Sequence, residues 1–248
     1  RGLGDVYKRQ SHDRITFFCG GGCAGAERKV VQLAARVKAP IAYTWRGKDY
    51  FEHDNPVGVG MTGLLGWGDA YKAMHESDLI VMWGTDFPYF NFLPTKPAIV
   101  QIDRRGEVLG RRCRLDLGIC GDVGATVDAL LGMVEEKKDS DHLDASLKRH
   151  AKDVKDMNAY MDGNDKESPI RPEQVTTAVN KYAAPDAVFT VDTGTPCIWS
   201  ARFLCSTLGR KTLASFNHGS MANAMPMAIG AQKLSLIHIS EPTRLQLI

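Results

Sequence analysis

The sequence predicts an α/β protein built on a doubly wound parallel sheet. Its strand candidates are short and apolar throughout, as in RITFFCG (14–20), DLIVMWG (78–84) and AIVQID (98–103). Segments with the apolar spacing of helices separate several of these strands. Strands that are apolar on both faces need cover on both faces, and alternation of strands with helices produces parallel neighbours. We therefore expect an open parallel sheet with helices on both sides.

The elements follow in order along the chain. The first strand, 14–20, leads into a helix over 24–38, whose apolar residues share one face and whose charges lie on the other. A second strand is expected at 40–45, and the segment 46–61 after it, which contains Gly, Pro and Asp, is predicted to be a long loop. The remaining elements of this unit are a helix over 63–75, strands at 78–84, 98–103 and 117–122, and a helix over 126–136.

A second α/β unit follows a change in composition. Segment 135–166 is dense in Lys, Asp and Glu and predicts an exposed helix followed by a linker at 162–172. We expect the first unit to span 11–165 and the second to span 166–233. The second unit is predicted to contain a helix over 172–182, a strand over 187–192, a turn at Gly194, and a tight loop, SFNHGSMANAMP (215–226), that leads into a buried helix.

The two ends of the chain are predicted to be foreign to the protein. Residues 1–10 and 234–244 can be back-translated into one DNA oligonucleotide read from its opposite strands, a relation that chance does not produce. The oligonucleotide resembles a transposase sequencing adapter, and 245–248 would then be barcode. The alternative is a native amphipathic tail. We leave 1–10 and 234–248 out of fold reasoning and expect 11–233 to be an internal piece of a longer protein.

Composition excludes several classes of protein. Apolar residues make up 44% of the chain and charged residues 24%, as in an ordinary globular protein. No apolar run reaches the roughly 18 residues that a membrane span needs. The formal charge of +2 gives no indication of a nucleic-acid partner. The six cysteines lack zinc-site spacing and are expected to be reduced and buried, as in a cytoplasmic protein, so no metal site is predicted.

A glycine motif follows the first strand. Gly20, Gly22 and Gly25 match G-x-G-x-x-G between a strand and a helix, where glycines let backbone amides approach a pyrophosphate. The acidic residue expected at the end of the second strand is missing, because that strand ends at Trp45 and Arg46. The motif alone therefore favours a nucleotide site and an ordinary Gly-rich turn equally.

Other strand ends carry more polar chemistry. TGLLG (62–66) and GTDFPY (84–89) contain glycines and hydroxyl groups, and the second follows a buried strand directly. Asp103 ends another strand, where its carboxylate either accepts ribose hydroxyls or caps the next turn. Ligands of open parallel sheets bind beyond the carboxyl ends of the strands. Together, these strand ends favour a nucleotide-type cofactor.

Two further sets of residues are weaker candidates. Asp192–Thr195 follow the strand of the second unit, where glycine and hydroxyl groups suit a diphosphate. A plain strand-to-helix turn explains them equally well. His53 and Asp54 lie in the predicted long loop, and we interpret them as a solvated pair rather than an acid/base site.

Two segments carry a family resemblance. FTVDTGTPCIW (189–199) and SFNHGSMANAMP closely resemble the start of the pyrophosphate domain of thiamine-diphosphate enzymes, specifically the family of quinone-linked pyruvate dehydrogenase and pyruvate oxidase. Five other segments resemble the central flavin domain of the same enzymes, and the resemblance covers essentially all of 11–232. These segments are CGGGCAGA (19–26), RGKDYFEHDNP (46–56), GMTGLLG (60–66), GTDFPY and QID.

The resemblance implies oxidative decarboxylation of pyruvate to acetate and CO2 with thiamine diphosphate and FAD, and electron transfer to a quinone. It implies thiamine-diphosphate contacts for Gly219, Ser220 and Met221, the Gly219 carbonyl accepting from the aminopyrimidine and Met221 wedging the cofactor into its bent shape. Weaker contacts with this cofactor are implied for Asp192, Gly194 and Thr195. FAD contacts are implied for Thr62, Gly63, Leu64, Leu65, Thr85, Asp86, Phe87, Pro88, Tyr89 and Asp103, and weaker ones for Gly20, Gly21, Gly22 and Arg46.

The resemblance also implies parts that lie outside this chain. They are an N-terminal domain with the family's activating glutamate, a Gly-Asp-Gly segment that binds Mg2+, and a C-terminus that contacts the inner face of the cell membrane. The complete enzyme is expected to be a homotetramer, and this chain alone is expected to be inactive, with no catalytic residue. Acetolactate synthase, oxygen-dependent pyruvate oxidase and a bare nucleotide-binding module with a structural flavin site are the alternatives.

Overall fold

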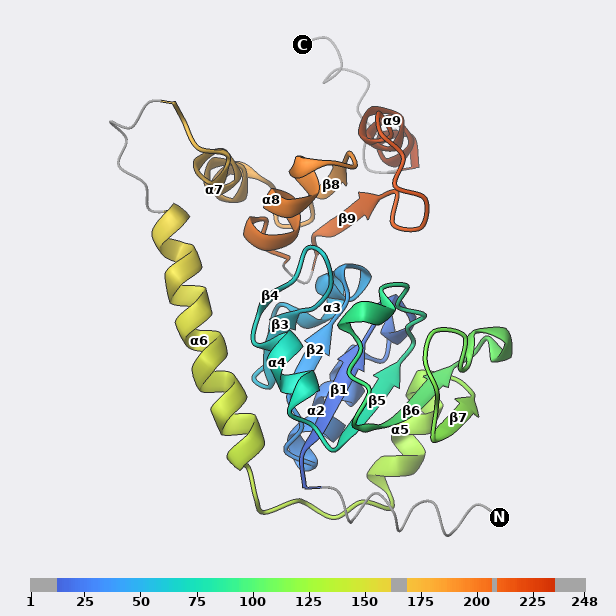
Figure 1. Cartoon of the computed structure of the whole chain (residues 1–248). Coiled ribbons are helices and arrows are strands. Elements are labelled where there is room, and N and C mark those ends of the chain that lie inside the picture. The colour runs from blue at the N-terminus through green and yellow to red at the C-terminus, as the bar shows by residue number, and fades with distance from the viewer. Residues whose placement is uncertain (1–12, 162–168, 207–208, 235–248) are drawn as a thin grey trace.

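The structure, a computed structural model, describes residues 13–161, 169–206 and 209–234 as two units (Figure 1). The larger unit, 13–161, is built around a seven-stranded sheet, and the smaller unit, which begins at 169, around a two-stranded sheet. The stretches predicted to be adapter-derived lie outside the described residues, with the exception of Leu234.

The larger sheet has a doubly wound order. The order is β4-β3-β2-β1-β5-β6-β7, and every neighbouring pair is parallel except β3 with β4. The direction of winding reverses between β1 and β5, which makes the C-terminal ends of these two strands the topological switch point. The strands are β1 (Ile15–Cys19), β2 (Ile41–Tyr43), β3 (Gly58–Met61), β4 (Trp67–Gly68), β5 (Leu79–Trp83), β6 (Ala98–Asp103) and β7 (Leu117–Cys120).

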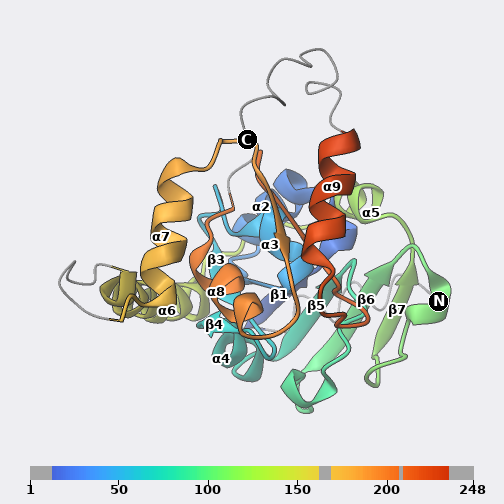
Figure 2. The same ribbon diagram turned by 90° about the horizontal axis from the view of Figure 1, so that it is seen from above.

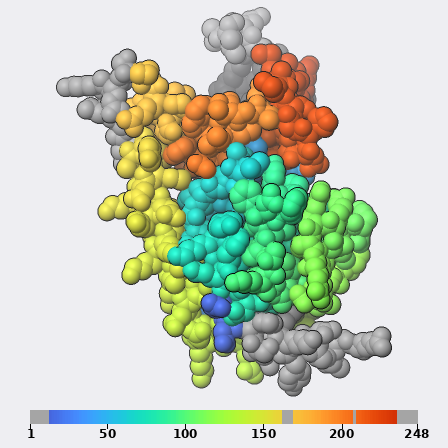
Figure 3. Space-filling model, viewed as in Figure 1, coloured from blue at the N-terminus to red at the C-terminus, as the bar shows by residue number. Residues whose placement is uncertain are grey.

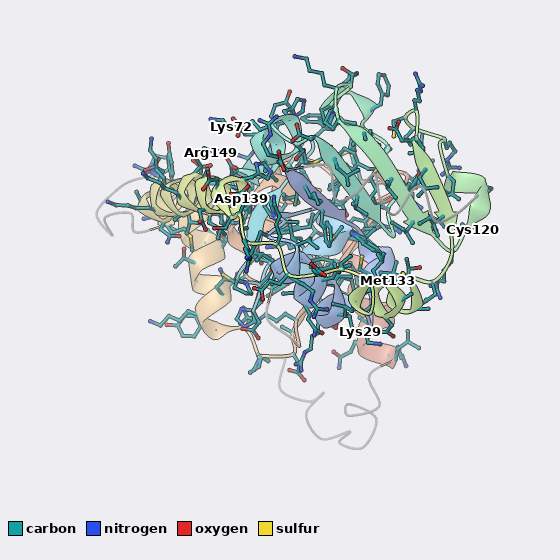
Figure 4. The ribbon with its side chains drawn as sticks, turned by 90° about the horizontal axis from the view of Figure 1, so that it is seen from below. Lys29, Lys72, Cys120, Met133, Asp139 and Arg149 are labelled. Carbon is teal, nitrogen blue, oxygen red and sulfur yellow. The ribbon has the colours of Figure 1, made fainter. Side chains whose placement is uncertain are left out.

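Helices cover both faces of this sheet. Helices α2 (Glu27–Arg36) and α5 (Val123–Leu131) pack together on one face, and α4 (Ala70–His75) lies on the other. The long helix α6 (Asp141–Met161) runs along the β3–β4 edge and packs on α4, as seen near Arg149 and Lys72 in Figure 4. Successive side chains of β1 and β5 point to opposite faces of the sheet, so a separate core lies on each face. Phe17, Val81 and Trp83 lie on the α2 face, and Phe18, Ile80 and Met82 lie on the α4 face.

Three predicted elements of the larger unit are wrong in extent. The predicted loop 46–61 contains the short helix α3 (Lys48–Phe51) and strand β3, because glycines alternate with the apolar residues of β3 and hide its pattern. The predicted helix 63–75 begins only at Ala70, since the glycines before it form turns and strand β4. The helix predicted over 126–136 is α5, which begins at Val123 because the Asp122 side chain accepts a hydrogen bond from the Ala125 amide, and which ends at Leu131, before Gly132, rather than at 136.

The smaller unit lies beyond the C-terminal ends of the parallel strands (Figures 1 and 2), and the space-filling view shows it seated on the larger unit (Figure 3). The helix expected from SFNHGSMANAMP is present and begins inside this segment, at Ala224, but the prediction that it is buried is wrong: none of its residues is buried, and Ile229 is 59% exposed. Within the described residues it packs mainly on one edge of the small sheet. The elements are α7 (Pro172–Tyr182), β8 (Val188–Val191), α8 (Thr195–Phe203), β9 (Lys211–Ala214) and α9 (Ala224–Leu234).

Two findings concern the predicted state of the cysteines and the predicted lack of a membrane span. All six cysteines are free thiols, but the prediction that they are buried is wrong for Cys113, which is half-buried, and for Cys120 and Cys205, which are exposed. Among the described helices, none combines the length and the apolar character that a bilayer crossing requires.

Candidate cofactor site

Four loops converge at the C-terminal edge of the larger sheet. We name three of them by their residues: the glycine loop (20–22) after β1, the TGLLG loop (62–66) after β3 and the GTDFPY loop (84–89) after β5. The fourth contains Arg46, after β2. A Cβ atom placed on Gly21 would lie 3.3 Å from the Arg46 Cβ, and one placed on Gly63 would lie 3.0 Å from the Phe87 ring. The structure thus brings the residues predicted from separate strand ends into one region.

The glycine loop packs directly on the GTDFPY loop. The Gly22 amide donates to the Gly84 carbonyl over 2.9 Å. A Cβ atom on Gly22 would lie 2.7 Å from the Gly84 Cα, and one on Gly20 would lie 2.6 Å from the Thr85 Cβ. The close approach of two backbone segments therefore accounts for these glycines. Helix α2 begins at Glu27, an acidic residue unsuited to a pyrophosphate, so the geometry favours the Gly-rich turn over the dinucleotide motif.

The TGLLG loop presents polar groups without partners. Thr62 is 3% exposed, and its Oγ1 is buried with no hydrogen-bond partner in the described chain. The amides of Gly63, Leu64 and Leu65 also contact no acceptor among the described residues. Buried polar groups in native proteins are nearly always paired, a rule that applies to the Thr62 hydroxyl, whereas Leu64 is 63% exposed. The loop therefore has the donors that a bound polar group would satisfy.

The backbone of the GTDFPY loop also has amide groups without a hydrogen-bond acceptor among the described residues. The amides of Thr85, Asp86 and Phe87 find no acceptor within the described part of the chain. The Thr85 carbonyl accepts from the Gln101 side chain over 3.0 Å, which ties the loop to β6. The loop thus offers backbone donors from a fixed position beside the TGLLG loop.

The predicted side chains of the GTDFPY loop have different roles. Asp86 is paired with Arg111 and Arg112, so its carboxylate anchors the loop. Phe87 is buried edge-on against Phe18, with ring centroids 5.1 Å apart. Pro88 and Tyr89 are exposed, as is Leu64 at the tip of the TGLLG loop.

Asp103 takes one of its two predicted roles. Its Oδ1 accepts from the Arg105 amide over 2.9 Å and from the Arg105 Nε over 3.3 Å. The carboxylate therefore caps the turn that follows β6. Its Oδ2 accepts no hydrogen bond from a described residue, so the ribose role is not occupied by another partner.

The predicted residues of the smaller unit lie together. A Cβ atom on Gly219, whose φ is +68°, would lie 3.7 Å from the Thr193 side chain. The Asp192 Oδ1 accepts from the amides of Asn223, over 2.6 Å, and Ala224, over 2.9 Å. Asp192 therefore caps the N-terminus of α9 and holds the segment that carries Gly219, Ser220 and Met221.

This segment is exposed and locally strained. Met221 is 79% exposed, and the Gly219 carbonyl accepts no hydrogen bond from a described residue. Ala222 has a φ of +56°, which costs a residue other than glycine about 1–3 kcal/mol. Gly194 has a φ of +135° where α8 begins at Thr195, and both are exposed. The strain thus lies beside Met221, where the resemblance implies a cofactor contact.

Contacts between the units reach the candidate residues. The Phe216 ring packs edge-on against Trp45 with centroids 4.9 Å apart, and the Arg46 guanidinium lies 5.0 Å from the same ring. The Arg202 side chain of α8 donates to the Leu65 and Gly66 carbonyls. Arg46 therefore contacts the segment SFNHGSMANAMP, and Arg202 contacts the TGLLG loop.

Sequence reasoning missed the residues that support these loops. Gln101 lies inside a predicted strand, and Arg111 and Arg112 lie in a connection without a motif. The arginine-rich segment 104–114 was the available signal for a partner of Asp86. Nothing in the sequence indicated the partners of Gln101 or Arg202, because each contact joins residues far apart in the chain.

The fold is that of a doubly wound α/β protein, and the candidate site lies at the C-terminal ends of its parallel strands. The family model for the central domain of thiamine pyrophosphate enzymes matches residues 10–130. The model for the C-terminal, thiamine-pyrophosphate-binding domain of the same enzymes matches 192–244, a range that includes residues predicted to be adapter-derived. The chain thus contains segments of the central and C-terminal domains of the thiamine pyrophosphate enzyme family.

Curated relatives agree with this assignment. An uncharacterised 42.6 kDa protein in the isoamylase 3′ region of Pseudomonas amyloderamosa is 50% identical over 56% of this chain and 35% of its own length. A putative thiamine pyrophosphate-containing protein, YdaP, of Bacillus subtilis is 30% identical over 91% of this chain and 38% of its own. The pyruvate oxidase of Lactiplantibacillus plantarum is 27% identical over 89% of this chain and 37% of its own length. The chain thus spans less than two fifths of each of these relatives.

Proposed function

We propose that the complete protein is a pyruvate oxidoreductase that uses thiamine diphosphate and FAD to convert pyruvate to acetate and CO2, with a quinone as electron acceptor. One observation carries the flavin part: the TGLLG loop meets the GTDFPY loop, which follows β5 at the switch point, and the two loops have amides and a buried Thr62 hydroxyl without a partner among the described residues. Open parallel sheets bind nucleotides at this place.

The two cofactors would be held by different units. FAD would be held by the backbone of Thr62–Leu65 and Thr85–Phe87, with the Asp103 Oδ2 available to a hydroxyl. Thiamine diphosphate would be held by Gly219, Ser220 and Met221, with Asp192 fixing that segment through α9. When bound, thiamine diphosphate supplies the carbanion chemistry of decarboxylation and FAD accepts the electrons.

The chain alone is expected to release no CO2 from pyruvate. The sequence contains no Gly-Asp-Gly segment, and among the described residues no three His, Cys, Asp or Glu side chains converge on a possible metal site. We expect Mg2+, the activating glutamate, a tetrameric assembly and a peripheral membrane contact to belong to the complete protein. Sequencing the source locus tests whether the tail derives from an adapter: native DNA that encodes LSLIHISEPTR in frame would contradict the adapter origin.

Flavin binding to this chain is the direct test of the FAD site. The purified chain should quench flavin fluorescence on titration with FAD. Thr62→Val removes the unpaired hydroxyl with little change of shape, so the dissociation constant should rise about fivefold. Thr95→Val, at an exposed position, is the matched control and should leave it unchanged. A chain that stays colourless after refolding with FAD would favour a vestigial nucleotide-binding module.

The reaction is tested on the complete gene. We expect CO2 release from pyruvate with a quinone dye as acceptor. Activity with oxygen alone would indicate a pyruvate oxidase, and formation of acetolactate would indicate an acetolactate synthase, since both kinds of enzyme are among the relatives.

A further inference from the structure

Helix α8 connects the two groups of residues that the proposed function uses. It begins at Thr195, in the segment that resembles a diphosphate contact, and its last turn carries Arg202. Its nine residues span about 13 Å. The neighbours of Arg202 anchor the helix, because Ala201 is 0% exposed and Phe203 7%. Arg202 is therefore presented from a fixed element.

Arg202 contacts two successive carbonyls of the TGLLG loop. Its Nε donates to the Leu65 oxygen over 3.2 Å, and an Nη donates to the Gly66 oxygen over 2.9 Å. A guanidinium is planar and carries its donors in a rigid fork, so two bonds fix the direction of both carbonyls.

These bonds hold one peptide plane from both sides. The Leu65 carbonyl and the Gly66 amide belong to the same planar group. The carbonyl is bonded to Arg202, and the amide donates to the Gly63 carbonyl over 2.8 Å. The turn 63–66 is thereby closed, and the amides of Gly63, Leu64 and Leu65 are left without acceptors in the described chain.

We propose that Arg202 is a positioning residue for the flavin. By holding the Leu65 and Gly66 carbonyls, it keeps the TGLLG loop in the conformation that presents the free amides of Gly63, Leu64 and Leu65 to the polar part of a flavin nucleotide. The conformation of the loop then depends on the docking of the smaller unit. The inference rests on the proposed flavin site, and by linkage flavin binding strengthens the docking of the smaller unit to the same extent.

Residue-resolved amide exchange, measured by NMR on the whole chain without flavin, tests the positioning itself. In Arg202→Met, the Gly66 amide should exchange at least about tenfold faster, because its peptide plane loses one of two anchors. The Thr62 amide donates to the Tyr43 carbonyl over 3.2 Å, independently of Arg202, and should keep its rate. Arg202→Lys, with a single ammonium, should restore part of the protection.

Arg36→Met is the matched control. Its guanidinium also donates to a backbone carbonyl, that of Leu131, but within the larger unit and away from the loop. The FAD dissociation constant should rise about tenfold in Arg202→Met and stay unchanged in Arg36→Met. Arg202→Lys should fall between Arg202→Met and the unmodified chain.

Each outcome decides a separate point. An unchanged Gly66 exchange rate in Arg202→Met overturns the positioning role, whatever the flavin does. Faster exchange with an unchanged FAD dissociation constant overturns the link from loop to flavin. An unmodified chain that takes up no FAD overturns the proposed function and the flavin part of this inference, while the exchange rates still decide whether Arg202 positions the loop.

Discussion

The two units differ in how completely they bury their apolar side chains. In the larger unit, Phe18, Ile80 and Trp83 are 0% exposed between the sheet and its helices. In the smaller unit, α7 and α9 contain no buried residue, and Tyr182 is 79% exposed. A two-stranded sheet offers too little surface to cover its helices. The larger unit is thus held by its own core, whereas the smaller unit depends on contacts outside its sheet.

Polar contacts join the two units, beside the apolar contacts of Phe216 with Trp45 and of Ala201 with the core of the larger unit. The Asp49 Oδ2 accepts from the Thr212 amide over 3.0 Å, and the Glu52 Oε2 accepts from the Ser206 amide over 2.7 Å. With the Arg202 bonds, these place charged side chains of one unit on backbone groups of the other. Such bonds give direction to the docking and contribute less than a buried apolar core.

The largest expected effect is the difference between an Ile→Ala substitution in the larger unit and one in the smaller unit. Ile80→Ala, in β5, should lower the free energy of unfolding by about 2–5 kcal/mol, because it leaves a cavity in a closed core. Ile229→Ala, in α9, should change it by less than about 0.5 kcal/mol, because the side chain is 59% exposed. Urea unfolding followed by circular dichroism measures both. Equal losses of unfolding free energy would show that the Ile229 side chain of α9 is packed in a core.

A smaller effect is expected at the contact between the units. Asp49→Ala removes the acceptor of the Thr212 amide in β9, so exchange of that amide should accelerate about tenfold. The unfolding midpoint of the larger unit should stay unchanged. Asp156→Ala, at an exposed position of α6, is the control for the loss of a carboxylate. An unchanged Thr212 rate would mean that the small sheet keeps its position without Asp49.

The sequence determines the sheet of the larger unit but leaves its edge unspecified. Strands β1, β5 and β6 are continuous apolar runs, and their hydropathy alone predicts a parallel sheet covered on both faces. Strand β3 contains Gly58 and Gly60 between its apolar residues, so its pattern is that of a loop. Its strand state comes from pairing with β2 and β4, which local sequence does not encode.

The candidate site was located by topology, and its details depend on tertiary contacts. The rule that parallel strands bind ligands at their carboxyl ends placed TGLLG and GTDFPY together. It did not distinguish free groups from occupied ones. Asp86 and Thr62 look equally available in the sequence, but Arg111 and Arg112 pair with Asp86 while the Thr62 hydroxyl has no partner among the described residues.

The smallest expected effect concerns pH and helix α6, which packs on β3, β4 and α4 within the larger unit and leads towards the smaller unit. His142 of α6 is 8% exposed, and its Nε2 lies 3.0 Å from the Thr16 hydroxyl of β1. Burial lowers the pKa of His142, nearby Arg14, Arg149 and Lys137 lower it further, and Glu76 opposes them. Burial also lowers the pKa of His150, against the effect of Asp153 and Asp69.

The sign of the effect follows from these shifts. The unfolded chain, whose histidines titrate near about 6.5, takes up protons before the folded chain does. The stability that His142 supports is therefore complete above about pH 6.5 and is lost as the pH falls through the lower pKa of the folded state. His142→Gln can still bond to Thr16 without titrating, so the fall of the urea midpoint on acidification should become shallower. His53→Gln, in a solvated loop pair, should keep the original slope. Equal slopes for His142→Gln and the unmodified chain would show that burial of His142 does not couple the docking of α6 to pH.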